Sequence, residues 1–192
     1  MNPLRLIYPK IPAKSWGQML VVTLVGALVG GCYGILHDQV TYTISEEYFT
    51  RFKFNQFSYA EPPVDSPRWF AGNIGFLATW WVGALVAWVL ARISVNREGA
   101  LPPRREFAIA FGIVFLVSIC AGVVGYGWGK WRRTTGYAEG WLSWMNALGV
   151  EDIEAFMTVG YIHNSSYLGG TIGMGFGIGY LAIRRRRRES SE

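Results

Sequence analysis

Four long apolar runs dominate the chain, and polar segments separate them. The runs cover about residues 16–36, 69–91, 107–128 and 164–183. A helix needs about 20 predominantly apolar residues to cross a bilayer, and each run is of that length. A soluble protein of this size would instead show short runs with a period of two or of 3.6 residues. The pattern therefore predicts an all-α membrane protein, a bundle of four transmembrane helices in a single domain.

Two polar excursions, residues 37–68 and 129–163, follow the first and the third spans. In the first, apolar residues at alternate positions between 40 and 44 predict a short strand or an extended link. Ser45 is an expected N-cap for a helix that follows it. In the second, we expect an amphipathic helix that ends at Gly149 and a further helix that leads into the fourth span.

The distribution of lysine and arginine predicts the orientation. The leader, the link between the second and third spans and the C-terminal tail hold 3, 4 and 5 of these residues, and the two excursions hold 3 each. By the positive-inside rule, both termini and the link are cytoplasmic and both excursions are periplasmic, as expected for a bacterial inner membrane protein. Because the arginines beside the spans account for the net charge of +5, the expected partner is the lipid bilayer and not a nucleic acid.

The first apolar run also resembles a signal peptide, and Val29-Gly30-Gly31-Cys32 resembles a loose lipoprotein cleavage box. The run is long for a signal peptide, so we expect an uncleaved span. Cys32 and Cys120 both fall inside apolar runs, and they suggest buried apolar side chains and no disulfide framework.

Glycines recur at every fourth position in the first and fourth spans, where they would form flat strips on one helix face and let another helix approach closely. We expect these two spans to be neighbours or to use the strips for self-association. Packing inside one bundle and a homo-oligomer are both compatible with the spacing. The glycines concerned are Gly26, Gly30, Gly34, Gly169, Gly173 and Gly177.

The only two histidines of the chain lie at two span ends that the predicted topology puts on the same face of the membrane. His37 and Asp38 end the first span, and His163 and Asn164 begin the fourth. If the glycine strips bring these spans together, the two imidazoles come within side-chain reach. The carboxylate of Glu47 is close in sequence to the first pair.

Imidazole and carboxylate groups together suit zinc, manganese or iron, and two histidines on separate helices could also ligate haem. We therefore predict a site for a divalent metal ion or a small polar ligand. The spacings match no established metal signature. In the simpler alternative, His37 and Asp38 only hydrogen-bond the second excursion and hold the two excursions together. The predicted metal ligands are His37, His163, Asp38 and Glu47, and the predicted ligand-binding residues are Asp38, Glu47, Asn164 and Tyr167.

Other chemistries have less support. The sequence contains no nucleophile elbow, P-loop or dinucleotide fingerprint, so we do not expect an enzyme, although a membrane-embedded metal-dependent enzyme is a third possibility. The four spans carry no charged residue between their ends, which argues against a pump or a coupled transporter.

Two blocks, HDQVTYTISEEYFTRFKF and YIHNSSYLGG, resemble those of an uncharacterised bacterial family of four-span integral membrane proteins. That family carries an H-D-Q-[VI]-T block followed by E-Y-F-T, and an H-N-x-S-Y-x-G-G block, at similar places. The resemblance covers the first excursion and the outer halves of spans one and four, and it implies no activity. It marks His37, Asp38, Gln39, Thr41, Glu47, Tyr48, Phe49, His163, Asn164, Ser166, Tyr167, Gly169 and Gly170.

Two functions are compatible with these observations. The first is a polytopic inner-membrane protein with an outward His/carboxylate site for a metal ion or a small polar ligand. The second is a non-catalytic accessory or assembly subunit of a larger membrane complex, which the glycine strips and the lack of a catalytic motif would suit.

Overall fold

The computed structural model describes residues 13–61, 65–95 and 101–190, and within these ranges the regular structure is helical without a strand. Most of the basic leader and part of the link between the second and third spans lie outside the described residues. The elements, in chain order, are α2 (Ala13–Ile44), the π-helical turn η1 (Tyr48–Lys53), α3 (Phe54–Gln56), the 3-10 turn η2 (Ser58–Ala60), α4 (Pro67–Ser94), α5 (Arg104–Thr135), α6 (Glu139–Ala147) and α7 (Ile153–Glu189).

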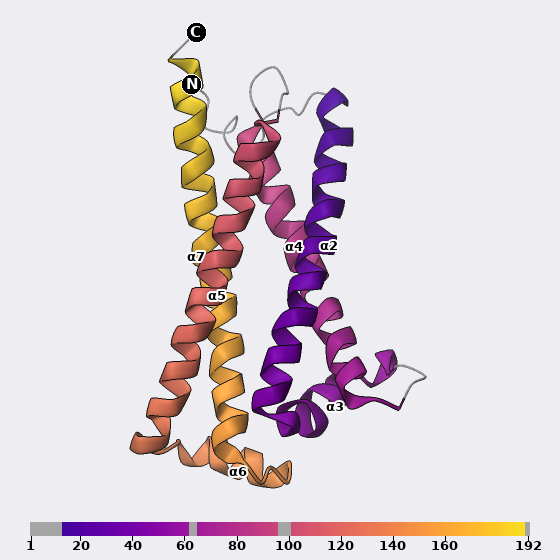
Figure 1. The fold of residues 1–192 in the computed structure, drawn as a ribbon, viewed down its shortest axis with the longest axis vertical. Coiled ribbons are helices and arrows are strands. Elements are labelled where there is room, and N and C mark those ends of the chain that lie inside the picture. The colour runs from indigo at the N-terminus through magenta and orange to yellow at the C-terminus, as the bar shows by residue number, and fades with distance from the viewer. Residues whose placement is uncertain (1–12, 62–64, 96–100, 191–192) are drawn as a thin grey trace.

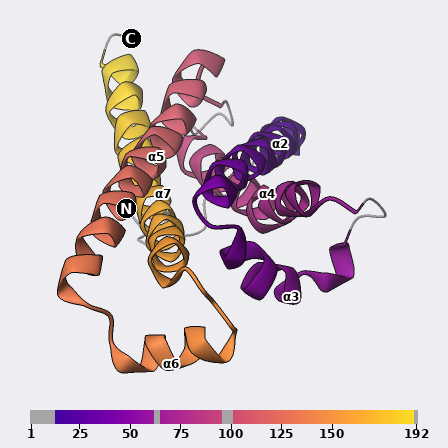
Figure 2. The same cartoon turned by 60° about the horizontal axis from the view of Figure 1, so that its bottom comes forward.

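The four long helices form two antiparallel pairs. α2 packs along α4 and α5 packs along α7, whereas contacts between the two pairs are far less extensive (Figure 1). The beginning of α2 and the end of α7 lie at one end of the molecule. The excursions with α3 and α6 lie at the other end, and the tilted view shows α3 and α6 to one side of the ends of the long helices (Figure 2).

Glycines let the backbones of α2 and α4 touch. A Cβ atom placed on Gly30 would lie 2.8 Å from the Cα of Gly83, and a Cβ on Gly34 would overlap the carbonyl oxygen of Gly75. The hydroxyl of Thr79 donates across the same interface to the carbonyl oxygen of Gly30, at 2.8 Å. Close backbone contact of this kind replaces the hydrophobic driving force that helices lack in lipid.

Glycines also allow close backbone contact between α5 and α7. A Cβ atom on Gly173 would lie 2.9 Å from the Cα of Val114, and a Cβ on Gly177 would lie 3.0 Å from the carbonyl oxygen of Ala110. Gly169 likewise faces α5. The prediction that the glycine strips of the first and fourth spans face each other is therefore wrong, because each strip faces the other helix of its own pair.

The predicted extended link between residues 40 and 44 is also wrong, because α2 continues to Ile44. The threonine hydroxyls donate hydrogen bonds to backbone carbonyl oxygens of the same helix. The hydroxyl of Thr41 donates to the carbonyl oxygen of His37 at 3.1 Å, and the hydroxyl of Thr43 donates to that of Val40 at 2.6 Å. Tertiary packing favours this extra turn, since it buries Tyr42 in the apolar cluster described next.

An apolar cluster closes the end of the molecule that carries the two excursions. Its fully or nearly fully buried members include Phe49 from η1, Met145 from α6 and Phe156 from α7. Ser45 accepts a hydrogen bond from the amide of Tyr48 at 3.2 Å, which is the contact expected of an N-cap. After α6, Gly149 has a φ of +70°, in agreement with its predicted place at the end of that helix.

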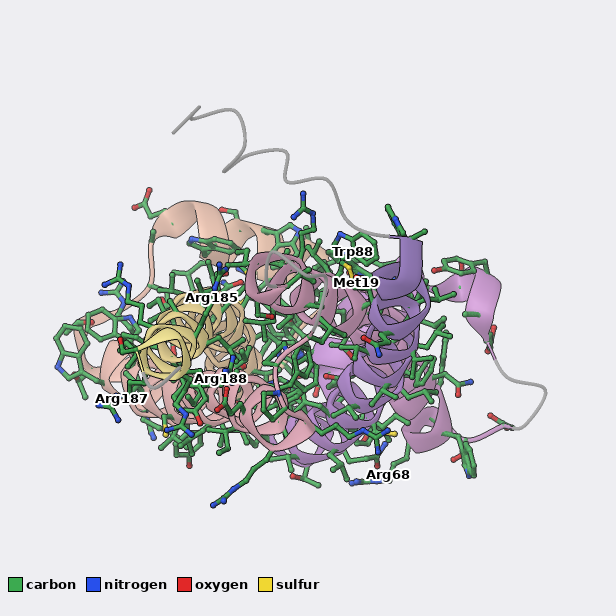
Figure 3. All side chains as sticks on the ribbon, turned by 90° about the horizontal axis from the view of Figure 1, so that it is seen from above. Met19, Arg68, Trp88, Arg185, Arg187 and Arg188 are labelled. Atoms are coloured by element: carbon green, nitrogen blue, oxygen red, sulfur yellow. The ribbon has the colours of Figure 1, made fainter. Side chains whose placement is uncertain are left out.

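Three of the described helices, α2, α4 and α5, are long and apolar enough to cross a membrane. Their outward faces carry large apolar side chains, with Leu24, Leu85 and Leu116 all more than half exposed. α7 is longer still, at 37 residues, but it does not reach the same hydropathy, because its apolar part is rich in glycine. Figure 3 looks down on the end with these arginines: Arg185, Arg187 and Arg188 surround the end of α7, while α2 and α4 lie to the other side.

Candidate metal site between the helix pairs

His37 and Asp38 of α2 and His163 of α7 come together where the two helix pairs meet. One carboxylate oxygen of Asp38 (Oδ1) lies 3.2 Å from Nδ1 of His37 and 3.2 Å from Nε2 of His163. One potential ligand atom from each of the three residues lies within 4.8 Å of the others. Asp38 is 5% exposed and His163 is 4% exposed. The structure thus brings together the two histidines and the aspartate that the sequence singled out, across two helices.

The orientation of the His163 ring follows from its backbone contact. Nδ1 lies 3.0 Å from the carbonyl oxygen of Val159, one turn earlier in α7. A carbonyl oxygen only accepts, so Nδ1 carries a proton, and Nε2 is the nitrogen that faces Asp38. A carboxylate oxygen only accepts, and a ring nitrogen without a proton does so too. Their approach to 3.2 Å therefore requires a proton or a metal cation between them.

A chain of hydroxyl groups supports the other histidine. Nε2 of His37 lies 3.4 Å from the hydroxyl of Ser166 on α7. The hydroxyl of Ser118, on α5, donates to the carbonyl oxygen of Ser166 at 2.9 Å and lies 3.2 Å from the hydroxyl of Tyr33 on α2. Because Ser118 uses its proton on the carbonyl, Tyr33 is the donor to Ser118. Sequence reasoning missed Tyr33 and Ser118; the one available signal was that they are polar residues inside apolar spans.

Aromatic rings from η1 cover His163. The Tyr48 ring stacks on the imidazole with ring centroids 5.0 Å apart, and the Phe49 ring lies 6.4 Å away at a steep angle. Consecutive side chains of η1 can both face the histidine because the π-helical turn rotates less per residue than an α-helix, a feature that recurs at functional sites. Burial raises the pKa of the Tyr48 phenol, with smaller contributions from Tyr167 and Asp38, so Tyr48 is neutral at physiological pH.

Lys53, at the end of η1, lies behind this aromatic layer. Its ammonium nitrogen is 6.0 Å from the centroid of the Tyr48 ring and 5.7 Å from that of Phe52. Burial lowers the pKa of Lys53, and the negative charge of Asp38 opposes this shift. The aromatic layer therefore separates a positive charge from the histidine, and Lys53 is not part of the ligand group.

The remaining predicted site residues lie outside the group of three. The carboxylate of Glu47 accepts hydrogen bonds from the backbone amides of Glu151, at 2.9 Å, and Asp152, at 2.7 Å. Glu47 thus ties the first excursion to the start of α7. Asn164 is exposed on another face of α7. Tyr167 is half exposed, with its ring centroid 6.2 Å from that of His163.

A polar groove lies beside Glu47. Its walls come from η1, the residues just before it and the residues just before α7. Four of the six lining side chains are acidic and one is basic. The lining residues are Glu46, Glu47, Thr50, Arg51, Glu151 and Asp152.

Two imidazoles and one carboxylate suit Zn²⁺, Fe²⁺ or Mn²⁺. The hydrogen bond from His163 to Val159 is the outer contact that metal-bound histidines usually make, and it leaves Nε2 free to bind. Three protein ligands would leave at least one coordination position open. The arrangement does not fit haem, because the rings of His37 and His163 touch edge to face with centroids 4.7 Å apart and leave no space for a porphyrin between them.

Comparison of the chain with protein-family models, with curated proteins and with solved structures found no match. A functional assignment therefore rests on the residues of the site and their geometry.

Proposed function

We propose that this chain is a polytopic inner-membrane protein that binds a divalent metal ion on its outer side, through His37, Asp38 and His163. The observation that carries the proposal is the contact between Asp38 and His163, in which a carboxylate oxygen and an imidazole nitrogen lie 3.2 Å apart inside the protein. A bound cation would be coordinated by the carboxylate of Asp38, by Nε2 of His163 and by a ring nitrogen of His37. The simpler alternative is a shared proton, and the two alternatives differ in metal content.

The proposed topology has four spans, with α7 as the fourth. Roughly 21 residues separate Trp16 from His37 on α2, and roughly 21 separate His163 from Arg184 on α7, so each segment is about 31 Å long at 1.5 Å per residue. That length matches the hydrocarbon core of a bilayer. Both histidines then lie at one boundary of the core, with tryptophan and arginine at the other, where such residues are favoured.

Two features support α7 as a span in spite of its moderate hydropathy. Gly169, Gly173 and Gly177 are packed against α5, so that side of the helix would not meet lipid. Its arginines begin only after the proposed span, where the side chains of Arg184 and Arg188 bond to the buried carboxylate of Glu106. Together with the lysine and arginine distribution, this topology puts both termini in the cytoplasm.

Metal analysis of the protein purified in detergent tests the proposal. After exposure to Zn²⁺ or Co²⁺ and removal of the excess, we expect one ion per chain in the wild type. Occupancy should fall at least about tenfold in His37→Ala, His163→Ala and Asp38→Ala, since each loses one ligand. Asn164→Ala, at an exposed position next to His163, is the matched control and should retain the ion.

Two results would contradict the proposal. One is a wild-type protein that stays metal-free although it is folded and monodisperse, which would favour the shared proton. The other is an ion that survives all three alanine substitutions, which would put it elsewhere. Partners that co-purify at a fixed ratio with a metal-free chain would instead favour the accessory-subunit function.

A further inference from the structure

The two histidines of the site differ in which ring nitrogen has a partner outside the group of three. In His163 that nitrogen is Nδ1, which donates to the carbonyl oxygen of Val159, so that Nε2 faces Asp38. In His37 the arrangement is reversed. Its Nδ1 lies 3.2 Å from Oδ1 of Asp38, and its Nε2 lies 3.4 Å from the hydroxyl of Ser166. The two rings thus present opposite nitrogens to the same carboxylate oxygen.

The separations between these three atoms fit ligands around a single ion. Two ligands of a tetrahedral ion, each about 2.0 Å from it, lie roughly 3.3 Å apart. Oδ1 of Asp38 is 3.2 Å from Nδ1 of His37 and 3.2 Å from Nε2 of His163, so two of the three ligand pairs already have this spacing. Nε2 of His37 faces Ser166 instead. Binding through that nitrogen would require the ring to turn over and to give up its contact with the hydroxyl.

Helix α5 contributes none of the three ligands, yet it holds Ser166 in this position. The hydroxyl of Ser118 donates to the carbonyl oxygen of Ser166 at 2.9 Å. Gly122, one turn further along α5, leaves room for the Ser166 hydroxyl, since a Cβ atom on Gly122 would lie only 2.6 Å from Oγ. Ser166 is 4% exposed, so bulk water does not compete for its hydroxyl. The contact with His37 is therefore built by packing between helices.

We propose that His37 binds the ion through Nδ1, and that Ser166 is the positioning residue that fixes this choice. With the ion on Nδ1, the proton of the neutral ring is on Nε2, which donates it in a hydrogen bond to the hydroxyl oxygen of Ser166. The site then uses both nitrogen types, Nδ1 of His37 and Nε2 of His163. This inference rests on the proposed function, and it extends that function from the ligands to the residue that orients one of them.

The test is nitrogen NMR of the full-length, Zn²⁺-loaded protein with ¹⁵N in its histidines only. The chain has two histidines, so their ring nitrogens give a spectrum that is simple to interpret. Couplings to the carbon-bound ring protons distinguish Nδ1 from Nε2, and the chemical shift distinguishes a protonated nitrogen from a metal-bound one. We expect one ring with its proton on Nδ1, as His163 has, and the other ring with its proton on Nε2.

Two alanine substitutions on α7 test the role of the hydroxyl. Ser166→Ala removes the hydrogen-bond partner of His37, so we expect the affinity for Zn²⁺ to fall about tenfold or more. The ring signals of one histidine should change and those of the other should stay. Ser165→Ala is the matched control, since it makes the same change at the adjacent position, where the side chain faces Gly125 of α5. It should keep the wild-type affinity and spectrum.

Two outcomes overturn the inference and leave the metal site standing. In one, both rings of the Zn²⁺-loaded wild type carry their protons on Nδ1, so that His37 binds through Nε2. In the other, a folded Ser166→Ala protein matches Ser165→Ala in affinity and in spectrum. The wild-type spectrum decides the question by itself if Ser166→Ala does not fold. A wild-type protein that binds no Zn²⁺ would overturn the proposed function and this inference together.

Discussion

Nε2 of His163 lies 3.2 Å from Oδ1 of Asp38, although 125 positions separate the two residues in the chain. This contact joins α2 to α7, two helices that otherwise touch little. Each of the two helix pairs is held by its own glycine contacts. Among the described residues, the contact between Asp38 and His163 is one of the polar contacts that connect the two pairs. A ligand at this point would bind to both pairs at once.

The first prediction separates the charge of Asp38 from its hydrogen bond. Asp38→Ala should destabilise the metal-free protein by about 3 kcal/mol, because it leaves Nε2 of His163 buried without a partner. Asp38→Asn should cost about 1 kcal/mol or less, since its amide can donate to Nε2, yet it should not bind metal. Thermal unfolding in detergent measures both, and equal losses for the two variants would contradict this account.

The second prediction concerns the contact of α2 with α4. Gly83→Leu should prevent stable folding, because even a Cβ atom at this position would overlap the backbone of Gly26. Gly127→Leu is the control on α5, where a Cβ would meet nothing within 4 Å. Size-exclusion profiles and melting temperatures in detergent report the difference. A Gly83→Leu protein with a wild-type melting temperature would argue against the helix pairing.

The third prediction tests Glu47, for which the sequence suggested a metal-binding role. Glu47→Ala should cost about 1–3 kcal/mol, because the amides of Glu151 and Asp152 lose their acceptor. Hydrogen exchange should quicken at the beginning of α7, and Glu47→Gln, which keeps one acceptor oxygen, should show a smaller effect. Metal occupancy should stay at the wild-type level. Loss of the ion from a well-folded Glu47→Gln protein would restore Glu47 as a ligand.

The fourth prediction concerns the opposite end of the molecule. Glu106 is 6% exposed, and its two carboxylate oxygens accept hydrogen bonds from Arg184, at 3.0 Å, and from Arg188. Glu106→Gln removes the charge that balances the two guanidinium groups, so we expect a loss of about 3 kcal/mol.

Glu139→Gln provides the control for this fourth substitution, since Glu139 is an exposed carboxylate at the start of α6. It should leave the melting temperature within about 1 °C of the wild type, because exposed charges contribute little. Both variants should bind metal normally, as Glu106 is far along α5 from the site. Equal melting temperatures for the two variants would show that the ion pairs at Glu106 are not stabilising.

The sequence by itself determined the helical segments. Runs of about 20 apolar residues predict membrane-crossing helices because lipid offers no partner for backbone amides, and three of the four runs meet this description in the structure. The sequence also singled out His37, Asp38 and His163, because polar and titratable side chains at the ends of apolar runs are few.

Only the tertiary structure decided which helices pair. A glycine strip shows that some backbone comes close, but any helix with a matching face can be the partner, and here chain neighbours pair. For the same reason the sequence could place Glu47 near His37 but could not show that its carboxylate binds the amides before α7. The roles of Tyr33 and Ser118 depend likewise on how three helices face one another. Apolar patterning is a local property of the chain, whereas a binding site depends on relative rotation and contact between helices, which local patterns do not fix.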